Sequence, residues 1–211
     1  MARSFMPRGH IERREHQDLG LFSGVTPRES KFKTDRVTGQ HAGKMTKLSE
    51  YGKQLRAKQS AKRLYGVLER QFRNYYRKAC RLSGSTGLNL LNLLEMRLDN
   101  VVYRLGLART RKEARQLISH GSIVVVTDGD RKRTINIPSF QVRPGYEIAV
   151  KEKSQKQLRI QEALELAKVR ILPEWLENDP QNFKGTVKRL PERSEMPSEI
   201  NELLIVELYS K

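Results

Sequence analysis

Apolar residues recur at helical spacing in the first half of the chain. The clearest set shares one helical face and consists of Leu68, Phe72, Tyr75, Tyr76 and Ala79. A weaker helical pattern begins at Ser49, and the polar and glycine residues of 83–87 end the second helix. Residues 1–46 have few periodic apolar positions. Alone they would be poorly ordered, and we expect them to order on a partner.

A further helical region follows residue 87. Its apolar residues form one core stripe, made of Leu91, Leu94, Leu98, Val101 and Leu105. This spacing predicts one continuous helix up to Gly106, which suits the left-handed conformation at a helix C-terminus. Thr110 and Glu113 match a capping box, in which the Thr hydroxyl accepts from the Glu113 N–H and the Glu side chain reaches back. The next helix is therefore predicted to run to His120 and to stop at Gly121.

Alternating patterns replace the helical spacing after Gly121. Ser122–Thr127 is rich in β-branched residues, Asp128-Gly129 is a strong turn signal, and Thr134–Ile137 alternates before Pro138. Tyr146–Val150 alternates again after a second turn. Two helices and a small antiparallel sheet of three strands are thus expected over residues 94–152.

The last 60 residues predict a helix and two strands. Residues 158–167 have helical spacing, residues 173–176 suggest a loop anchored by Trp175, and residues 183–191 and 201–210 suggest strands that pair late. The predicted fold class is α+β, in four parts. These are a basic N-terminal extension (1–46), a helical domain (47–93), an inserted αα-βββ unit (94–152) and a C-terminal helix with strands that pack back on the helical domain (153–211).

Positive charge dominates the first 150 of the 211 residues. The formal net charge is +17 with a pI near 10.2, and the net charge is +12 for residues 1–80, +5 for residues 81–150 and zero for residues 151–211. Such a balance favours a polyanionic partner, because contacts with phosphates release condensed counterions. An acidic membrane surface is the competing partner.

Other classes of protein find little support in the composition. No apolar run reaches the 18 residues of a spanning helix and no signal peptide opens the chain, so we expect a soluble, cytoplasmic protein. Cys80 is the single cysteine, which leaves no disulfide framework and no cysteine zinc site, and we expect it to be a small buried residue. No cofactor-binding fingerprint is present.

The predicted helix after Thr110 separates its charge from its core. On a helical wheel, Lys112, Arg115 and Ser119 lie beside Arg111, and the apolar residues lie on the other side. A solvated surface is the simpler interpretation of such an arc. However, like charges at Arg111 and Arg115 destabilise a helix by roughly 0.2–0.5 kcal/mol, so a bound phosphate backbone is the better explanation. We therefore expect alanine at both positions to weaken binding of the polyanionic partner and to leave the thermal midpoint almost unchanged.

The sequence resembles a known family at this point. RLDNVVYRLGLARTRKEARQLISHGSI (97–123), followed by INIPSFQVRPGYEIAV (135–150), is similar to bacterial small-subunit ribosomal protein four, whose helix-and-sheet module is a widespread RNA-binding domain. The similarity covers nearly the whole chain. Further matching motifs are Gly39-Gln40-His41, Ser49-Glu50-Tyr51-Gly52, Lys58-Gln59, Tyr65-Gly66, Glu69-Arg70-Gln71-Phe72-Arg73 and Glu207-Leu208-Tyr209-Ser210.

The resemblance implies a structural protein of the small (30S) ribosomal subunit. Family members bind 16S rRNA directly in its 5′ domain, nucleate assembly of the subunit body, contact small-subunit protein five, and act with proteins five and twelve in translational accuracy. They also line the region where mRNA enters the subunit. The implied RNA-binding residues are Arg3, Arg8, Arg13, Arg14, Gln40, His41, Lys44, Tyr51, Lys53, Gln54, Arg56, Lys58, Gln59, Lys62, Arg70, Arg73, Arg104, Arg109, Thr110, Arg111, Lys112, Arg115, Gln116 and His120.

Two departures from the family pattern stand out. Many members bind zinc through four N-terminal cysteines, which this chain lacks, and His10 and His16 have no partners for a metal site. The chain therefore resembles the zinc-free form, and no metal or other cofactor is expected. The hairpin at residues 124–133 is also several residues longer than usual, which leaves its register and any RNA contact of Arg131, Lys132 and Arg133 open.

An enzyme is the alternative from another class. Pseudouridine synthases carry the same RNA-binding module and an Arg-Leu-Asp motif, which residues 97–99 match. Leu98 belongs to the predicted core stripe, however, which places Asp99 in mid-helix near Tyr103 and Arg104, and the chain after the module is too short for a catalytic fold. A stress-type RNA-binding factor would leave residues 1–90 unexplained. Base stacking on Tyr51, Tyr65 or Tyr76 is expected wherever these rings are exposed.

Overall fold

The computed structural model describes residues 7–15, 19–22, 47–127 and 131–210, and divides the chain into two compact units. The first unit contains residues 1–91 and 197–211, and the second contains residues 92–196. This division differs from the expected one, in which residues 153–211 formed one C-terminal part. Residues 153–196 belong instead with the sheet of the second unit, and only the last helix belongs with the first.

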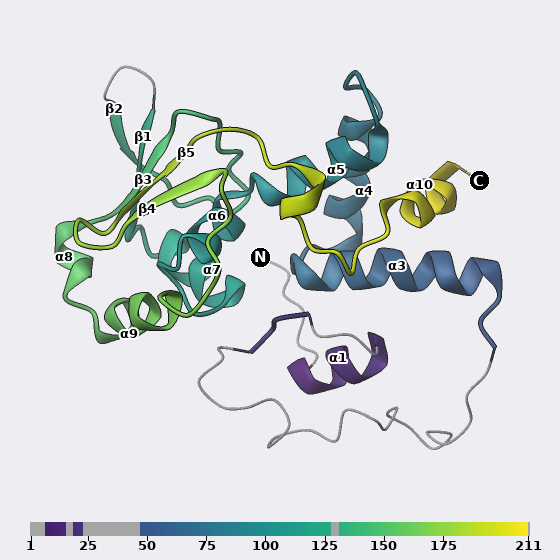
Figure 1. The fold of residues 1–211 in the computed structure, drawn as a ribbon, viewed down its shortest axis with the longest axis horizontal. Coiled ribbons are helices and arrows are strands. Elements are labelled where there is room, and N and C mark those ends of the chain that lie inside the picture. Colours follow the sequence, from purple (N-terminus) through teal and green to yellow (C-terminus); the bar gives the residue numbers. More distant parts are fainter. Residues whose placement is uncertain (1–6, 16–18, 23–46, 128–130, 211) are drawn as a thin grey trace. The chain divides into compact units, whose positions relative to one another are not determined.

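The described part of the first unit is helical. Its elements are α1 (Arg8–Glu15), α3 (Glu50–Leu64), α4 (Glu69–Ala79), the first part of α5 (Thr86–Glu95) and α10 (Glu202–Ser210). Ser49 begins α3, because its side chain accepts a hydrogen bond from the Gly52 N–H. Both α1 and α10 pack against α3 (Figure 1). On α4, Phe72, Tyr75 and Ala79 are buried, which confirms the predicted apolar face.

The C-terminal segment 201–210 is a helix, so the predicted strand is wrong. Asn201 accepts hydrogen bonds from the N–H groups of Leu203 and Leu204, which starts α10. The run of residues 203–206 is apolar throughout and has no alternation to select a strand. Ile205 is buried, and the Tyr209 ring stacks on Tyr76 with ring centroids 4.6 Å apart. Packing on α3 and α4 therefore decides the conformation of this segment.

Cys80 is exposed, contrary to the prediction of a buried residue. Helix α4 ends at Ala79, and Cys80 is its C-cap. The following residues 81–85 are exposed as well. Within the described residues, burial along α4 thus ends at Ala79, and continuing the apolar stripe to Cys80 was not justified.

A five-stranded antiparallel sheet in the order β2-β1-β3-β5-β4 forms the second unit (Figure 1). The strands are β1 (Ile123–Thr127), β2 (Arg131–Thr134), β3 (Glu147–Val150), β4 (Leu176–Asp179) and β5 (Lys184–Val187), and the helices are the end of α5, α6 (Leu98–Arg104), α7 (Arg111–Ser119), α8 (Glu152–Gln155), α9 (Leu158–Ala167) and the 3-10 turn η1 (Arg193–Glu195). The sheet therefore contains two strands from the C-terminal part, β4 and β5, in addition to the three that the sequence predicts. Strand β5 confirms the prediction for residues 183–191.

Tight packing between α6 and β5 fixes the core of this unit. Leu105, Leu117, Val125, Ile148 and Trp175 all belong to one buried cluster. Gly185 in β5 must lack a side chain, because a Cβ there would lie 2.4 Å from Cδ2 of Leu105. The sheet thus packs in close contact with the C-terminal end of α6. Among the described residues, no helix is both long and apolar enough to span a membrane.

The predicted continuous helix over residues 88–105 is in fact two helices. Arg97 is extended, with φ −72° and ψ 136°, and forms a β-bridge with Gln141. The N–H groups of Leu98 and Asp99 donate to the carbonyls of Phe140 and Pro138, which satisfies the first turn of α6. The stripe residues are buried as predicted, but Asp99 lies in the first turn of a helix and not in its middle.

Strand β2 is shifted from its predicted position. It pairs Arg131–Thr134 with Val124–Thr127, whereas the expected strand was Thr134–Ile137. The carbonyls of Pro138 and Phe140 serve as acceptors for α6, so the chain leaves the sheet after Thr134 to reach them. Alternation in residues 134–137 therefore does not reflect strand pairing.

Candidate nucleic-acid interface

Helix α7 presents cations on the side away from its core. Ala114, Leu117 and Ile118 are buried, while Lys112 is exposed, which confirms that charge and core are separate. The Thr110 hydroxyl accepts from the Glu113 N–H at 3.2 Å, as predicted. The return hydrogen bond differs, because the Glu113 carboxylate accepts from the Arg109 N–H at 2.9 Å. Gln116 and His120 are also exposed on this helix.

Arg115 forms an ion pair that the sequence analysis missed. Its Nε donates to Oδ2 of Asp99 at 2.7 Å. Asp99 is 1% exposed and also accepts from Nε and a terminal nitrogen of Arg97 at 3.1 and 2.8 Å. The expected neighbours of Asp99, Tyr103 and Arg104, are thus not its ion-pairing partners. The buried Asp99 carboxylate thus pairs with two arginines, the buried Arg97 and the partly exposed Arg115.

Arg111 is held in a similar way one turn earlier. Its Nε donates to Oδ1 of Asn100 at 2.8 Å, and its guanidinium carbon lies 4.5 Å from the centroid of the Tyr103 ring. Asn100 donates in turn to the Glu95 carboxylate at 2.6 Å. Helix α6 therefore supplies an acceptor for each of these arginines in the absence of a partner, and the Asp99 carboxylate offsets the charge of Arg115.

Two other arginines predicted to bind RNA are occupied by carboxylates. Arg104 donates to both Glu95 oxygens, at 3.0 and 3.3 Å. Arg109 pairs with Glu113 at 3.3 Å and with Glu162 at 2.8 Å. We call the three cations of α7 itself, Arg111, Lys112 and Arg115, the α7 surface.

The hairpin adds a second set of cations in this unit. All residues of β2 are exposed, and β2 is the edge strand of the sheet. Arg133 lies opposite Val125, and Arg131 lies opposite Thr127. Directly opposed residues of an antiparallel pair point to the same face, and buried Val125 faces the helices. Arg131 and Arg133 therefore point to the helix side of the sheet, and Lys132 points to the other side.

In the first unit, the cations of α3 are largely paired. Lys58 and Lys62 both bond to Glu69, at 2.8 and 3.1 Å, and Lys53 bonds to Glu50 at 2.7 Å. Burial alone would raise the pKa of Glu69, but hydrogen bonds from Lys58, Lys62 and Tyr209 bring this pKa below its usual value. These lysines thus stabilise the helical unit besides any role in RNA binding.

The remaining α3 residues are partly buried. Arg56 pairs with Glu15 of α1 at 3.4 Å, and Arg63 pairs with the same carboxylate. Gln54 is buried and donates to Glu207 of α10 at 2.9 Å. Gln59 is half-buried. The side chain of Gln54 is therefore used within the protein, which argues against the RNA contact expected for it.

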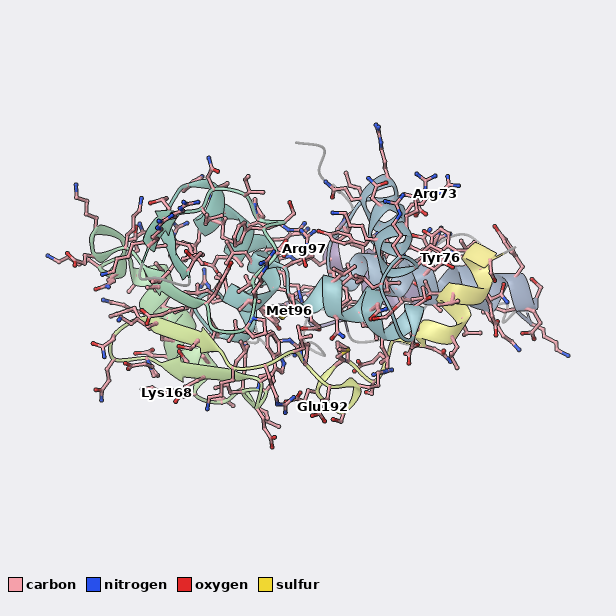
Figure 2. All side chains as sticks on the ribbon, turned by 90° about the horizontal axis from the view of Figure 1, so that it is seen from above. Arg73, Tyr76, Met96, Arg97, Lys168 and Glu192 are labelled. Carbon is pink, nitrogen blue, oxygen red and sulfur yellow. The ribbon has the colours of Figure 1, made fainter. Side chains whose placement is uncertain are left out.

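Exposed cations gather on the outer face of α4 in the described part of this unit. Arg70, Arg73 and Arg77 lie within an arc of about 60°, opposite the buried face of the helix. Lys78 and Arg81 extend this surface and are exposed as well. Figure 2 shows Arg73 projecting from the helix. We call these five residues the α4 surface; none of them forms an ion pair with a described carboxylate.

Arg77, Lys78 and Arg81 were absent from the residues inferred from the family resemblance. The helical spacing that identified the buried face of α4 was sufficient to place Arg77 beside Arg73. That spacing is the signal that finds Arg77, whereas Arg81 lies beyond the end of the helix.

The tyrosines differ in their exposure. Tyr51 is 58% exposed and can stack on a base, whereas Tyr65 is 1% exposed and cannot. Tyr76 is half-buried, and its ring stacks on that of Tyr209. Stacking on RNA is thus an option for Tyr51 alone among these three.

The N-terminal residues are only partly described. Arg14 is exposed on α1, Arg8 is half-buried, and Arg13 donates to the Gly9 carbonyl at 3.2 Å. The predicted contacts Arg3, Gln40, His41 and Lys44, together with His16, lie outside the described residues. In the part of the chain that is described, no three His, Cys, Asp or Glu side chains are grouped as metal ligands would be.

Comparison with known proteins identifies the family. Residues 6–95 match the model of the ribosomal protein S4/S9 N-terminal domain, and residues 96–125 match that of the S4 domain. The chain is also 56% identical to the small ribosomal subunit protein uS4 of Shewanella loihica, over the full length of both chains. The chain belongs to the uS4 family. It is therefore a structural ribosomal protein with an RNA-binding domain, and the sequence-based resemblance is confirmed.

Membership of the uS4 family also decides the enzyme question. The chain is not an enzyme, and Arg97-Leu98-Asp99 is not a catalytic motif. In this uS4 chain, Arg97 and Asp99 form a buried ion pair that supports Arg115. The S4 domain match ends within β1, so the α7 surface lies inside it and β2 lies beyond it.

Proposed function

We propose that the chain is a primary binder of 16S rRNA. It contacts the 5′ domain of this RNA through the α7 surface and the α4 surface, and nucleates assembly of the body of the 30S subunit. The observation that carries the proposal is the α7 surface, in which the cations form an arc separate from the buried arc of a helix within the S4 domain. Phosphate contacts of this kind suit recognition of RNA by shape.

The charge distribution supports the same conclusion. The net charge of +17 lies entirely in residues 1–150, which include both surfaces. Each phosphate contact releases counterions, so the affinity should fall with salt by about 0.7–0.9 log units per log unit of salt for each contact. The α4 surface is available for such contacts without the loss of an ion pair.

Protein partners form a finer part of the proposal. The family resemblance supports direct contact with small-subunit protein five, a joint role with proteins five and twelve in translational accuracy, and a position where mRNA enters the subunit. Residues 151–211 have a net charge of zero, which favours a protein neighbour for this part of the chain. The proposed location is the cytoplasmic ribosome.

Binding to defined RNA fragments tests the proposal. We expect the purified chain to co-sediment with small subunits and to protect the 5′ domain of 16S rRNA in footprinting, and to bind a 3′-domain fragment of equal length more weakly. The affinity for the 5′ domain should decrease steeply between 50 and about 200 mM salt. Equal affinity for the two fragments, or an affinity that does not depend on salt, would contradict the proposal.

A further inference from the structure

Helix α6 contains two buried polar residues that core packing does not explain. Asp99 and Asn100 are each 1% exposed, next to the apolar core residues Val101 and Val102. A buried charge is unfavourable unless it is paired, and an apolar residue of similar size often replaces a buried ion pair without loss of stability. Stability alone therefore does not explain why Asp99 and Asn100 are buried in this helix.

Both residues bind an arginine of the α7 surface in the same manner. Asp99 accepts from Nε of Arg115 at 2.7 Å, and Asn100 accepts from Nε of Arg111 at 2.8 Å. Neighbouring residues on α6 thus hold residues one turn apart on α7. In each case the inner edge of the guanidinium is fixed, and the Arg115 side chain remains 30% exposed.

Each of these two acceptors is itself held in place by further hydrogen bonds within the protein. Arg97 donates two hydrogen bonds to Asp99, and Asn100 donates to the side chain and the carbonyl of Glu95 at 2.6 and 2.9 Å. The bond from Asn100 to Glu95 also fixes which amide atom faces Arg111, because the nitrogen must point to the carboxylate. The Tyr103 ring supports the Arg111 guanidinium from its face.

We propose that Asp99 and Asn100 are positioning residues for RNA binding, which hold Arg115 and Arg111 in the orientation that meets phosphate oxygens. A fixed guanidinium loses less rotamer freedom when it binds, so orientation adds affinity without any new contact. This inference rests on the proposed binding of 16S rRNA. It assigns an RNA-binding role to buried residues that never touch the RNA.

The sign of one substitution separates positioning from simple electrostatics. Asp99→Asn removes a negative charge beneath a cationic surface, so long-range attraction alone predicts tighter binding of RNA. Positioning predicts weaker binding, by about 2- to 10-fold, since one arginine must then be ordered on binding.

A double-mutant cycle with the full chain and a 5′-domain fragment of 16S rRNA tests the inference. We expect Asp99→Asn to weaken binding when Arg115 is present and to have no further effect on Arg115→Ala. Val102→Ala, a buried change on the same helix, is the control for lost stability and should leave the affinity unchanged. The Nε–H resonance of Arg115 should be ordered by NMR relaxation in the unsubstituted chain and mobile in Asp99→Asn.

The outcomes are distinct. Tighter or unchanged binding by Asp99→Asn, or an equal loss with and without Arg115, would overturn the inference while the binding of 16S rRNA by the unsubstituted chain stands. Absence of that binding would instead refute the proposed function. If Asp99→Asn does not fold, the same cycle with Asn100→Ala and Arg111→Ala decides, and a loss independent of Arg111 would overturn the inference.

Discussion

Tyr209 in the last helix donates a hydrogen bond to the Glu69 carboxylate in α4, 3.0 Å away and 140 residues earlier in the chain. The same ring stacks on Tyr76, and Nζ of Lys58 lies 5.6 Å from its centroid. Burial and the nearby Glu69 carboxylate both raise the pKa of Tyr209, so the hydroxyl stays protonated and remains a donor. Tyr209 thus links α10 to α4 within the helical unit.

Replacement of Tyr209 by phenylalanine should destabilise the protein mildly. Tyr209→Phe keeps the ring stack and removes the hydrogen bond to Glu69, which costs about 1 kcal/mol. Tyr209→Ala also removes the stack and should cost at least about 1 kcal/mol more. Urea unfolding followed by circular dichroism measures both, with the exposed Tyr51→Phe as the control. Equal losses for the two variants would show that the ring packing contributes nothing.

Stability should fall in acid partly through Glu69. The pKa of Glu69 is lowered from 4.5 on folding, so its contribution is fully present above pH 4.5 and is lost as the pH falls through the folded-state pKa. Glu69→Gln should lower the free energy of unfolding at pH 7 and flatten its decrease below pH 4.5. Glu165→Gln, on the exposed face of α9, is the control. An identical acid slope in Glu69→Gln and the unsubstituted chain would contradict the assignment.

The sequence predicted the helices and the core better than the sheet. Buried stripes such as that of α4 follow from local spacing, and Gly106 ends α6 with φ +77° as expected. Strands β4 and β5 join the sheet through β3, where Thr186 pairs with Glu147. Such pairing joins residues far apart in the chain, so no local pattern indicates it. Helix α10 was missed because its short apolar run has no polar face to show a period.

The α7 surface was found from the sequence, but its support was not. The cationic arc follows from helical spacing alone. Asp99 was interpreted as a mid-helix residue, and Asn100 was not singled out, because their partners, Arg115 and Arg111, belong to another helix. The break at Arg97 depends on the carbonyls of residues 138 and 140, which lie still further along the chain. Buried polar groups are thus the part of the site that needs the structure.

Arg115→Ala should now be expected to lower stability, in contrast to the sequence-based expectation of an unchanged thermal midpoint. It leaves Asp99 with Arg97 as its ion-pairing partner, and the loss of one charged hydrogen bond at a partly exposed arginine costs about 1–2 kcal/mol. Thermal unfolding by calorimetry measures this, with exposed Lys112→Ala as the control. An unchanged midpoint for Arg115→Ala would show that Arg97 alone satisfies Asp99.

The α4 surface should act in RNA binding and not in folding. Arg73→Ala with Arg77→Ala removes two exposed cations, so the affinity for the 5′-domain fragment should fall and the salt slope should decrease by about 1.4–1.8. The free energy of unfolding should change by less than about 0.5 kcal/mol. Lys184→Ala on β5 with Lys188→Ala directly after it removes the same charge from exposed positions of the second unit. A similar loss of affinity in both pairs would mean that only the net charge matters.

The long hairpin offers the last test, because its register divides its cations between two faces. Arg131 and Arg133 share the helix side of the sheet with buried Val125, and Lys132 points to the opposite side. If the hairpin extends the RNA-binding face of α7, Arg131→Ala with Arg133→Ala should weaken binding and lower the salt slope by about 1.4–1.8. Lys132→Ala should change neither, because its side chain lies on the other face. Fluorescence anisotropy with a labelled 5′-domain fragment measures both, and a larger effect of Lys132→Ala would place the RNA on the opposite side of the sheet.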